Sequence, residues 1–102
     1  MYTCGRMVTQ RSHLRDLYRL FAVTKTEKEA EMLLADILTP QELESVAERW
    51  QLIQALHAGK PQREIAHGLK LSISKITRGS RMLKYGSGGF ELFLKKLKKA
   101  RK

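Results

Sequence analysis

The stretch QREIAHGLKLSISKITRGSRMLK, residues 62–84, decides the fold of this chain. Its first part has the apolar spacing of a short helix, which ends near Lys70. Ser72 is suited to open a second helix, because a serine side chain can accept hydrogen bonds from the free amides at a helix start. The pattern predicts a helix-turn-helix over about residues 61–84.

Helices that cross steeply need small or apolar residues at their contact, and Ala66 is the small residue at the expected closest approach. Lys70 departs from the common pattern, in which glycine is frequent, and a lysine fits there if its φ angle stays negative. An ordinary αα-hairpin with a basic face remains the alternative. The residues expected to face inward are Ile65, Ala66, Leu69, Leu71, Ile76, Gly79 and Leu83.

The remaining face of the second helix is polar and cationic. Its hydroxyl groups can hydrogen-bond to base edges or phosphates, and its Arg and Lys side chains can pair with phosphates and guanine. This chemistry is typical of a recognition helix that lies in the major groove of double-stranded DNA. The residues on this face are Ser74, Lys75, Thr77, Arg78 and Arg81.

Charge is segregated along the chain, whose 102 residues carry a net charge of +10. Residues 1–48 hold 6 Lys/Arg against 8 Asp/Glu, a net of −2. Residues 49–102 hold 14 Lys/Arg against 2 Asp/Glu, a net of +12. Solubility needs no such segregation, so the second half is expected to face a polyanion. A solvated basic surface is the alternative.

Helix signals recur along the rest of the chain and no strand pattern appears, which predicts an all-α fold of about six short helices. Ser12 is a candidate cap for a first helix, Thr26 for a second, and Thr39-Pro40 for a third. A last amphipathic helix begins near Phe90. The expected organisation is a flexible basic arm (1–11), a single helical domain (12–99) and a basic tail (100–102).

Short amphipathic helices expose much apolar surface when each chain packs alone, which favours a homodimer. The residues expected in the shared core are Leu17, Phe21, Val46, Trp50 and Phe93.

QREIA followed by ITRGS resembles the bacterial Trp repressor family, and LTPQELESVAERWQLIQAL (38–56) is similar to the helix before its reading head. The resemblance covers about residues 17–97. The turn GKPQ (59–62) looks one residue shorter than in the tryptophan-binding repressors, which is more like the Trp-repressor-like YerC/YecD branch. The resemblance implies a transcriptional regulator, built as an intertwined all-helical homodimer with two reading heads.

The resemblance also implies which residues contact the DNA operator. Those positions fall on Gln62, Ile73, Ser74, Thr77 and Lys84.

A small-molecule corepressor pocket is implied in the same way. Two guanidinium groups would sandwich an aromatic ring there, and one of them would pair with a carboxylate. Lys75 stands where the family has a threonine and Met82 where it has a serine, which disfavours L-tryptophan as the ligand. The pocket positions are Leu38, Thr39, Arg49, Arg78 and Gly79.

Other classes of function find little support. The three histidines and Cys4 share no metal-ligand spacing, and no catalytic arrangement is visible, so neither a metal site nor an enzyme is expected. The single cysteine and the lack of a long apolar run predict a cytoplasmic protein. Two alternatives stay open. One is a basic DNA-compacting protein with little specificity, and the other a membrane- or partner-binding module built on the tail ELFLKKLKKARK (91–102).

Overall fold

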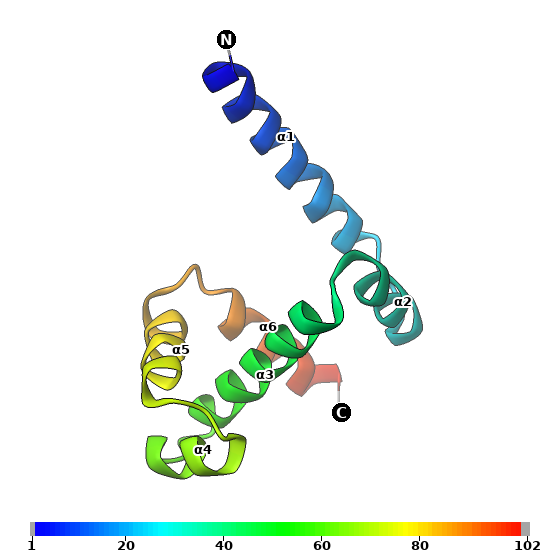
Figure 1. The fold of residues 1–102 in the computed structure, drawn as a ribbon. Coiled ribbons are helices and arrows are strands. Elements are labelled where there is room, and N and C mark those ends of the chain that lie inside the picture. The colour runs from blue at the N-terminus through cyan, green and yellow to red at the C-terminus, as the bar shows by residue number, and fades with distance from the viewer. Residues whose placement is uncertain (1, 101–102) are drawn as a thin grey trace. The chain divides into compact units, whose positions relative to one another are not determined.

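The computed structural model describes the backbone of residues 2–100 and the side chains of residues 10–100. All six regular elements in this range are helices, which confirms the all-α fold class (Figure 1). The chain divides into two compact units, Met1–Thr39 and Pro40–Lys102. The helices are α1 (Tyr2–Ala22), α2 (Glu27–Ile37), α3 (Pro40–His57), α4 (Gln62–Leu69), α5 (Ile73–Tyr85) and α6 (Gly89–Ala100).

A hydrogen-bonded cap starts α2 in the first unit. The Thr26 hydroxyl oxygen accepts a hydrogen bond from the Glu29 backbone N–H at 3.1 Å. The Glu29 carboxylate in turn accepts one from the Lys25 backbone N–H at 2.9 Å. This confirms the predicted cap at Thr26 and makes a capping box, in which the return bond goes to the residue before the cap and not to the cap itself.

The predicted start of the first helix at Ser12 is wrong, because α1 begins at Tyr2. The residues before Ser12 include no proline, and their one glycine costs only about 1 kcal/mol in a helix interior, so the helix continues through them. Residues 2–11 of the predicted arm therefore belong to α1, and the arm's flexibility stays a prediction. The side chains of residues 1–9 lie outside the described part of the chain.

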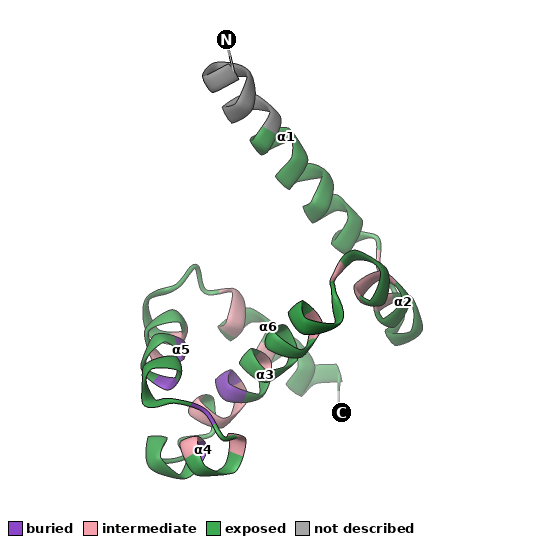
Figure 2. Cartoon of the chain, in the orientation of Figure 1, coloured by how far each residue is buried: buried purple, intermediate pink, exposed green. Residues whose placement is uncertain are grey.

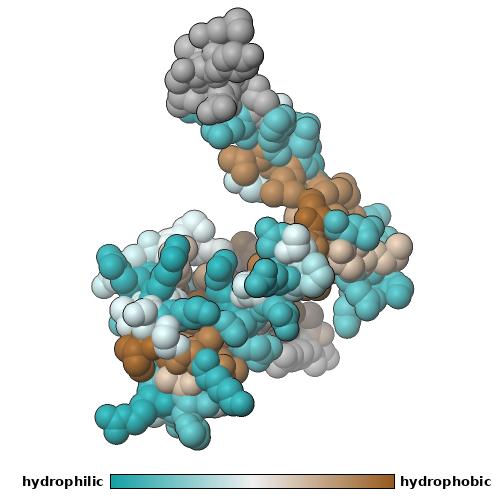
Figure 3. All heavy atoms as spheres, in the orientation of Figure 1, coloured by the Kyte–Doolittle hydropathy of each residue, from teal (hydrophilic) through white to brown (hydrophobic). Residues whose placement is uncertain are grey.

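The first unit buries little. Every side chain that the structure describes on α1 is exposed, including Leu17 and Phe21, and none is buried on α2. Figure 3 shows apolar residues on the visible surface of both helices. The first unit of a single chain therefore has no core of its own among residues 10–39.

The second unit is built on α3, against which α4 and α5 pack. α3 begins at Pro40, as predicted, because proline has no N–H to lose at the first helical position. It ends before Gly59, whose φ of +84° favours glycine. The buried residues lie on α3, α4 and α5 and in the turn between α4 and α5 (Figure 2). The apolar core residues are Leu52, Ile53, Ile65, Leu71 and Ile76.

The turn between α4 and α5 combines one confirmed prediction with one correction. The Ser72 hydroxyl oxygen accepts a hydrogen bond from the Lys75 backbone N–H at 3.2 Å, which confirms the predicted cap. The φ angle of Lys70 is +55°, not negative as expected. Both Lys70 and Leu71 donate their backbone N–H to the Ala66 carbonyl. The left-handed residue thus ends α4 and turns the chain so that Leu71 enters the core.

α6 is joined to this unit through an aromatic contact. The rings of Trp50 on α3 and Phe90 on α6 stack with centroids 6.1 Å apart. Trp50 is half-buried, whereas Val46 and Phe93 are exposed in the single chain. Their burial in a shared dimer core stays a prediction.

Candidate nucleic-acid interface and adjoining cleft

The structure exposes all eight residues predicted to contact DNA. Ile76 and Gly79 are buried, so the side of α5 that carries them faces the interior of the protein. This leaves the opposite side, with Ser74, Thr77 and Arg81, in solvent. The exposed set is Gln62, Ile73, Ser74, Lys75, Thr77, Arg78, Arg81 and Lys84.

Positive charge dominates α4, α5 and the turn between them. Glu64 is the only acidic residue over residues 62–85. Within the described part of the chain, Lys75 is the only one of these cations that forms an ion pair. The others stand in solvent without a carboxylate partner, which suits a surface that meets an anion. These cations are Arg63, Lys70, Lys75, Arg78, Arg81 and Lys84.

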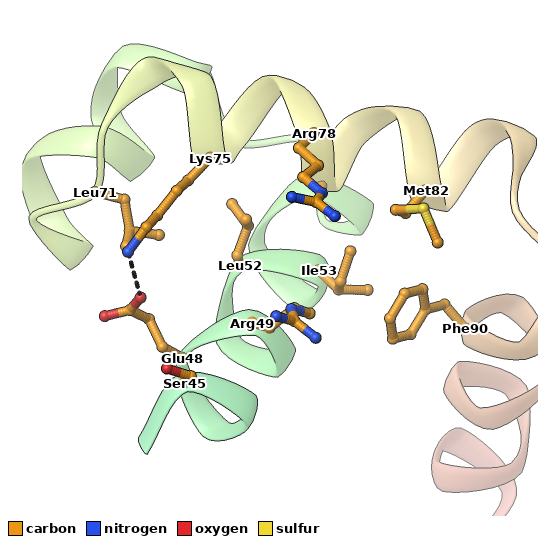
Figure 4. Close-up of a pocket in the computed structure, with 11 residues that line it drawn as sticks. Ser45, Glu48, Arg49, Leu52, Ile53, Leu71, Lys75, Arg78, Met82 and Phe90 are labelled. Carbon is orange, nitrogen blue, oxygen red and sulfur yellow. Dashed lines mark ion pairs between the residues drawn. The ribbon is translucent and has the colours of Figure 1, made fainter. Parts of the chain in front are cut away.

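A cleft of about 350 Å³ lies between α3 and α5, next to the start of α6. Figure 4 shows Arg49 on α3 and Arg78 on α5, both among the side chains that line it. Gly79 also lines the cleft, so three of the five predicted pocket residues come together. Leu38 and Thr39 belong to the first unit, and their place in a ligand site stays a prediction.

α5 therefore presents two different polar faces. Ser74, Thr77 and Arg81 lie on the side of α5 opposite the buried Ile76 and Gly79. They therefore project away from the core. Lys75, Arg78 and Met82 follow one another at helical spacing along the cleft. The predicted DNA-contacting residues are thus divided, with Lys75 and Arg78 on the cleft side.

An ion pair crosses the mouth of the cleft. The Nζ atom of Lys75 lies 3.6 Å from Oε1 of Glu48 on α3 (Figure 4). Both side chains are well exposed, and ion pairs of this kind contribute about 0–1 kcal/mol. Lys75 was predicted to face outward, and its pairing with Glu48 could not be predicted because no local motif joins the two positions.

Two more residues of the cleft bear on ligand binding. Met82 lines it and brings a thioether where the family resemblance implied a hydroxyl. The Phe90 ring adds an apolar wall from α6, which the sequence interpretation had not assigned to the pocket. The helical spacing of Phe90 marked it only as part of an apolar face.

The described residues include neither a metal-binding cluster nor a membrane-spanning helix. No group of three or more His, Cys, Asp and Glu side chains in that part of the chain is arranged to hold a metal ion. None of the described helices is long and apolar enough to cross a membrane.

Comparison with known proteins gives a consistent result. The family model for the Trp repressor protein matches residues 12–98. A Trp operon repressor homolog of Chlamydia caviae is 42% identical over 83 residues, covering 80% of this chain and 82% of the relative. The homolog of the same name from Chlamydia trachomatis serovar L2 is 42% identical over 94 residues, covering 91% and 82%. That of Actinobacillus succinogenes is 43% identical over 72 residues, covering 70% of each chain.

No solved structure matches this chain significantly. The sequence matches define the class of protein as a DNA-binding transcriptional regulator. The matching family is a family of regulators, not of enzymes. The chain belongs to the Trp repressor family.

Proposed function

We propose that this protein represses transcription by binding specific double-stranded DNA through a helix-turn-helix formed by α4 and α5. The observation that carries the proposal is the anchoring of α5. Ile76 is fully buried and Gly79 packs on α3, so the opposite face of α5 is held outward on a rigid support. A recognition helix needs such a support, because base contacts depend on its position in the major groove.

The exposed residues divide by chemistry into base and phosphate contacts. Ser74 and Thr77 are short hydroxyl side chains on the outward face, suited to base edges. Arg81 and Lys84 suit phosphates, as does Gln62 at the start of α4. The apolar Ile73 is 56% exposed at the start of α5, where it would contact a thymine methyl group.

We propose further that the active form is a homodimer. The first unit leaves Leu17, Phe21 and Val23 exposed in the single chain, and α6 leaves Phe93 and Leu97 exposed. Apolar surfaces of this kind are typical of interfaces between protein chains. A dimer would pair two reading heads, so the preferred DNA site would be near-palindromic. Light scattering at micromolar concentration tests this, and a folded monomer would refute it.

We propose that DNA binding by this protein does not require L-tryptophan. Arg49, Lys75 and Arg78 bring three positive charges to the cleft against the one carboxylate of Glu48. This balance favours the carboxylate of an amino acid and disfavours its ammonium group. Met82 offers no hydroxyl to hold that ammonium. A corepressor of another chemistry remains compatible with the cleft.

Selection of bound sequences from random DNA tests the proposed function. We expect enrichment of one near-palindromic motif, both with and without added amino acids. Binding without any enriched motif would instead support a DNA-compacting protein of low specificity. A regulator of this kind acts where the chromosome lies, so the predicted cytoplasmic location is part of the proposal.

A further inference from the structure

We propose that the lysine face of α6 is a second DNA-binding surface, which contacts phosphates without sequence preference. The lysine face consists of Lys95, Lys96, Lys98 and Lys99, all exposed. The inference rests on the proposed DNA-binding function and adds to it a contact outside the helix-turn-helix.

The orientation of α6 is set by its apolar side. Phe90 stacks on Trp50, and Leu94, one helical turn later, is half-buried. Phe93 and Leu97 share that side of the helix, where the proposed dimer core would cover them. The lysine face therefore points away from this packing and into solvent.

No carboxylate of the described residues neutralises the charges of this face. Glu91 is the only acidic residue of α6, and none of the four lysines forms an ion pair among the described residues. Lys96 lies over the Phe93 ring at 5.6 Å from its centroid, a contact that leaves its charge unchanged. Lys95 and Lys99 stand at i and i+4, where like charges destabilise a helix. A bound polyanion would relieve this repulsion.

The arrangement favours DNA over a lipid surface. A membrane-bound amphipathic helix inserts its apolar face. In α6, Phe90 stacks on Trp50 of α3, and the proposed dimer core would cover the exposed Phe93 and Leu97, so this face would not be free to enter lipid. Lys95 and Lys99 lie about 6 Å apart along the helix axis. The phosphates of one DNA strand follow at about 3.4 Å along its axis, so flexible lysine stems can reach alternate phosphates. In Figure 1, α5 and the end of α6 lie on different sides of α3.

The test compares two charge-matched double variants. Lys95→Gln with Lys99→Gln removes two charges from the lysine face, and Lys25→Gln with Lys28→Gln removes two exposed charges from the first unit. Affinity for a 30-bp duplex of arbitrary sequence is measured between 50 and 200 mM NaCl. Each lost phosphate contact reduces the magnitude of the negative slope of log K against log salt by about 0.9. The slope of the α6 variant should therefore be shallower by about 1.8 per chain. Between 50 and 200 mM NaCl, the wild type should therefore lose roughly ten times more affinity per chain than the α6 variant loses. The first-unit variant should retain the wild-type slope.

Two controls keep the result interpretable. Lys95→Arg with Lys99→Arg keeps the charge and should keep the slope. Thermal unfolding at low salt should show the glutamine variant at least as stable as the wild type, since a like-charge pair is removed.

An unchanged slope in the glutamine variant, with the wild type still binding DNA, would overturn this inference and leave the proposed function standing. Failure of the wild type to bind any DNA would refute the proposed function and this inference with it. Sedimentation with phosphatidylcholine–phosphatidylglycerol vesicles that is lost in the glutamine variant, alongside an unchanged DNA slope, would assign the face to lipid instead.

Discussion

Gly79 of α5 packs directly against Leu52 of α3, and a Cβ atom added to Gly79 would lie 2.7 Å from the Leu52 Cδ2 atom. Leu52 is itself 4% exposed and belongs to the core, so it has little room to move aside. The absence of a side chain at residue 79 therefore sets how closely α5 approaches α3. This packing role stands beside the ligand role implied for Gly79 by the family resemblance.

Replacement of Gly79 by alanine should destabilise the protein. Overpacking of a filled core costs about 1–3 kcal/mol, and the gain in helix propensity returns about 1 kcal/mol, so we expect a net loss of about 1 kcal/mol. Gly68→Ala is the matched control, because nothing lies within 4 Å of the Cβ position there and the change should stabilise α4. Urea unfolding measures both. Equal stabilisation by the two variants would show that Leu52 yields without cost.

Replacement of Lys70 by glycine should stabilise the protein by about 1 kcal/mol. A non-glycine residue at φ +55° is strained by about 1–2 kcal/mol, and glycine adopts this region freely at a modest cost in unfolded-state entropy. Lys70→Ala removes the charge and keeps the strain, so it should give no such gain. Denaturant midpoints of the two variants separate the causes, and an equal rise in both would trace the effect to charge.

Loss of the cap at Ser72 should weaken α5. Ser72→Ala removes the acceptor of the Lys75 N–H, which costs about 1 kcal/mol at a helix start. Ser74→Ala, two residues later, removes an exposed hydroxyl that caps nothing and should change the unfolding free energy by less than about 0.5 kcal/mol. If both substitutions cost the same in chemical denaturation, the Ser72 bond does not stabilise the helix.

Thr77→Ala should reduce discrimination among DNA sequences more than it reduces binding to arbitrary DNA. A contact to a base edge carries sequence information, and one good contact is worth about 1–3 kcal/mol of discrimination. Arg81→Ala provides the contrast, because loss of a phosphate contact should weaken all DNA binding alike. The measurement compares dissociation constants for the selected operator and a scrambled duplex. Uniform losses for Thr77→Ala would reassign it to the DNA backbone.

L-Tryptophan should change operator affinity by less than tenfold. The reason is the cationic lining of the cleft, with Lys75 and Met82 at positions where hydroxyls would favour the amino acid. Lys75→Thr combined with Met82→Ser restores those hydroxyls and should increase the response to tryptophan. Calorimetric titration and operator binding, each with and without the amino acid, decide the question. A micromolar dissociation constant with a tenfold gain in wild-type operator affinity would contradict the proposal.

The sequence predicted features that depend on neighbouring residues. The starts at Thr26, Pro40 and Ser72 follow from caps, which involve side chains within one helical turn. The inward face of α5 followed from helical spacing, and Ile76 and Gly79 are indeed buried. Ser12 shows the limit of this reasoning, since a possible cap does not interrupt a helix that nothing else breaks.

Features that depend on packing between distant segments were not accessible in this way. The positive φ of Lys70 serves the burial of Leu71, and local preference alone favours the opposite sign. The contact between Glu48 and Lys75 requires α3 and α5 to lie side by side, which no spacing within either helix reveals. The place of Phe90 at the cleft has the same origin.

The lack of buried side chains across residues 10–39 has a consequence for the life of the protein in the cell. α2 has 11 residues, and isolated helices of this length are marginal in water. The first unit must therefore be stabilised by whatever covers it. If a second copy does so, the folded fraction rises with protein concentration by mass action. A newly synthesised chain would be exposed to proteases until it bound a second copy. A higher concentration of the protein would shorten that time of exposure. The supply of working regulator would then increase more steeply than its rate of synthesis.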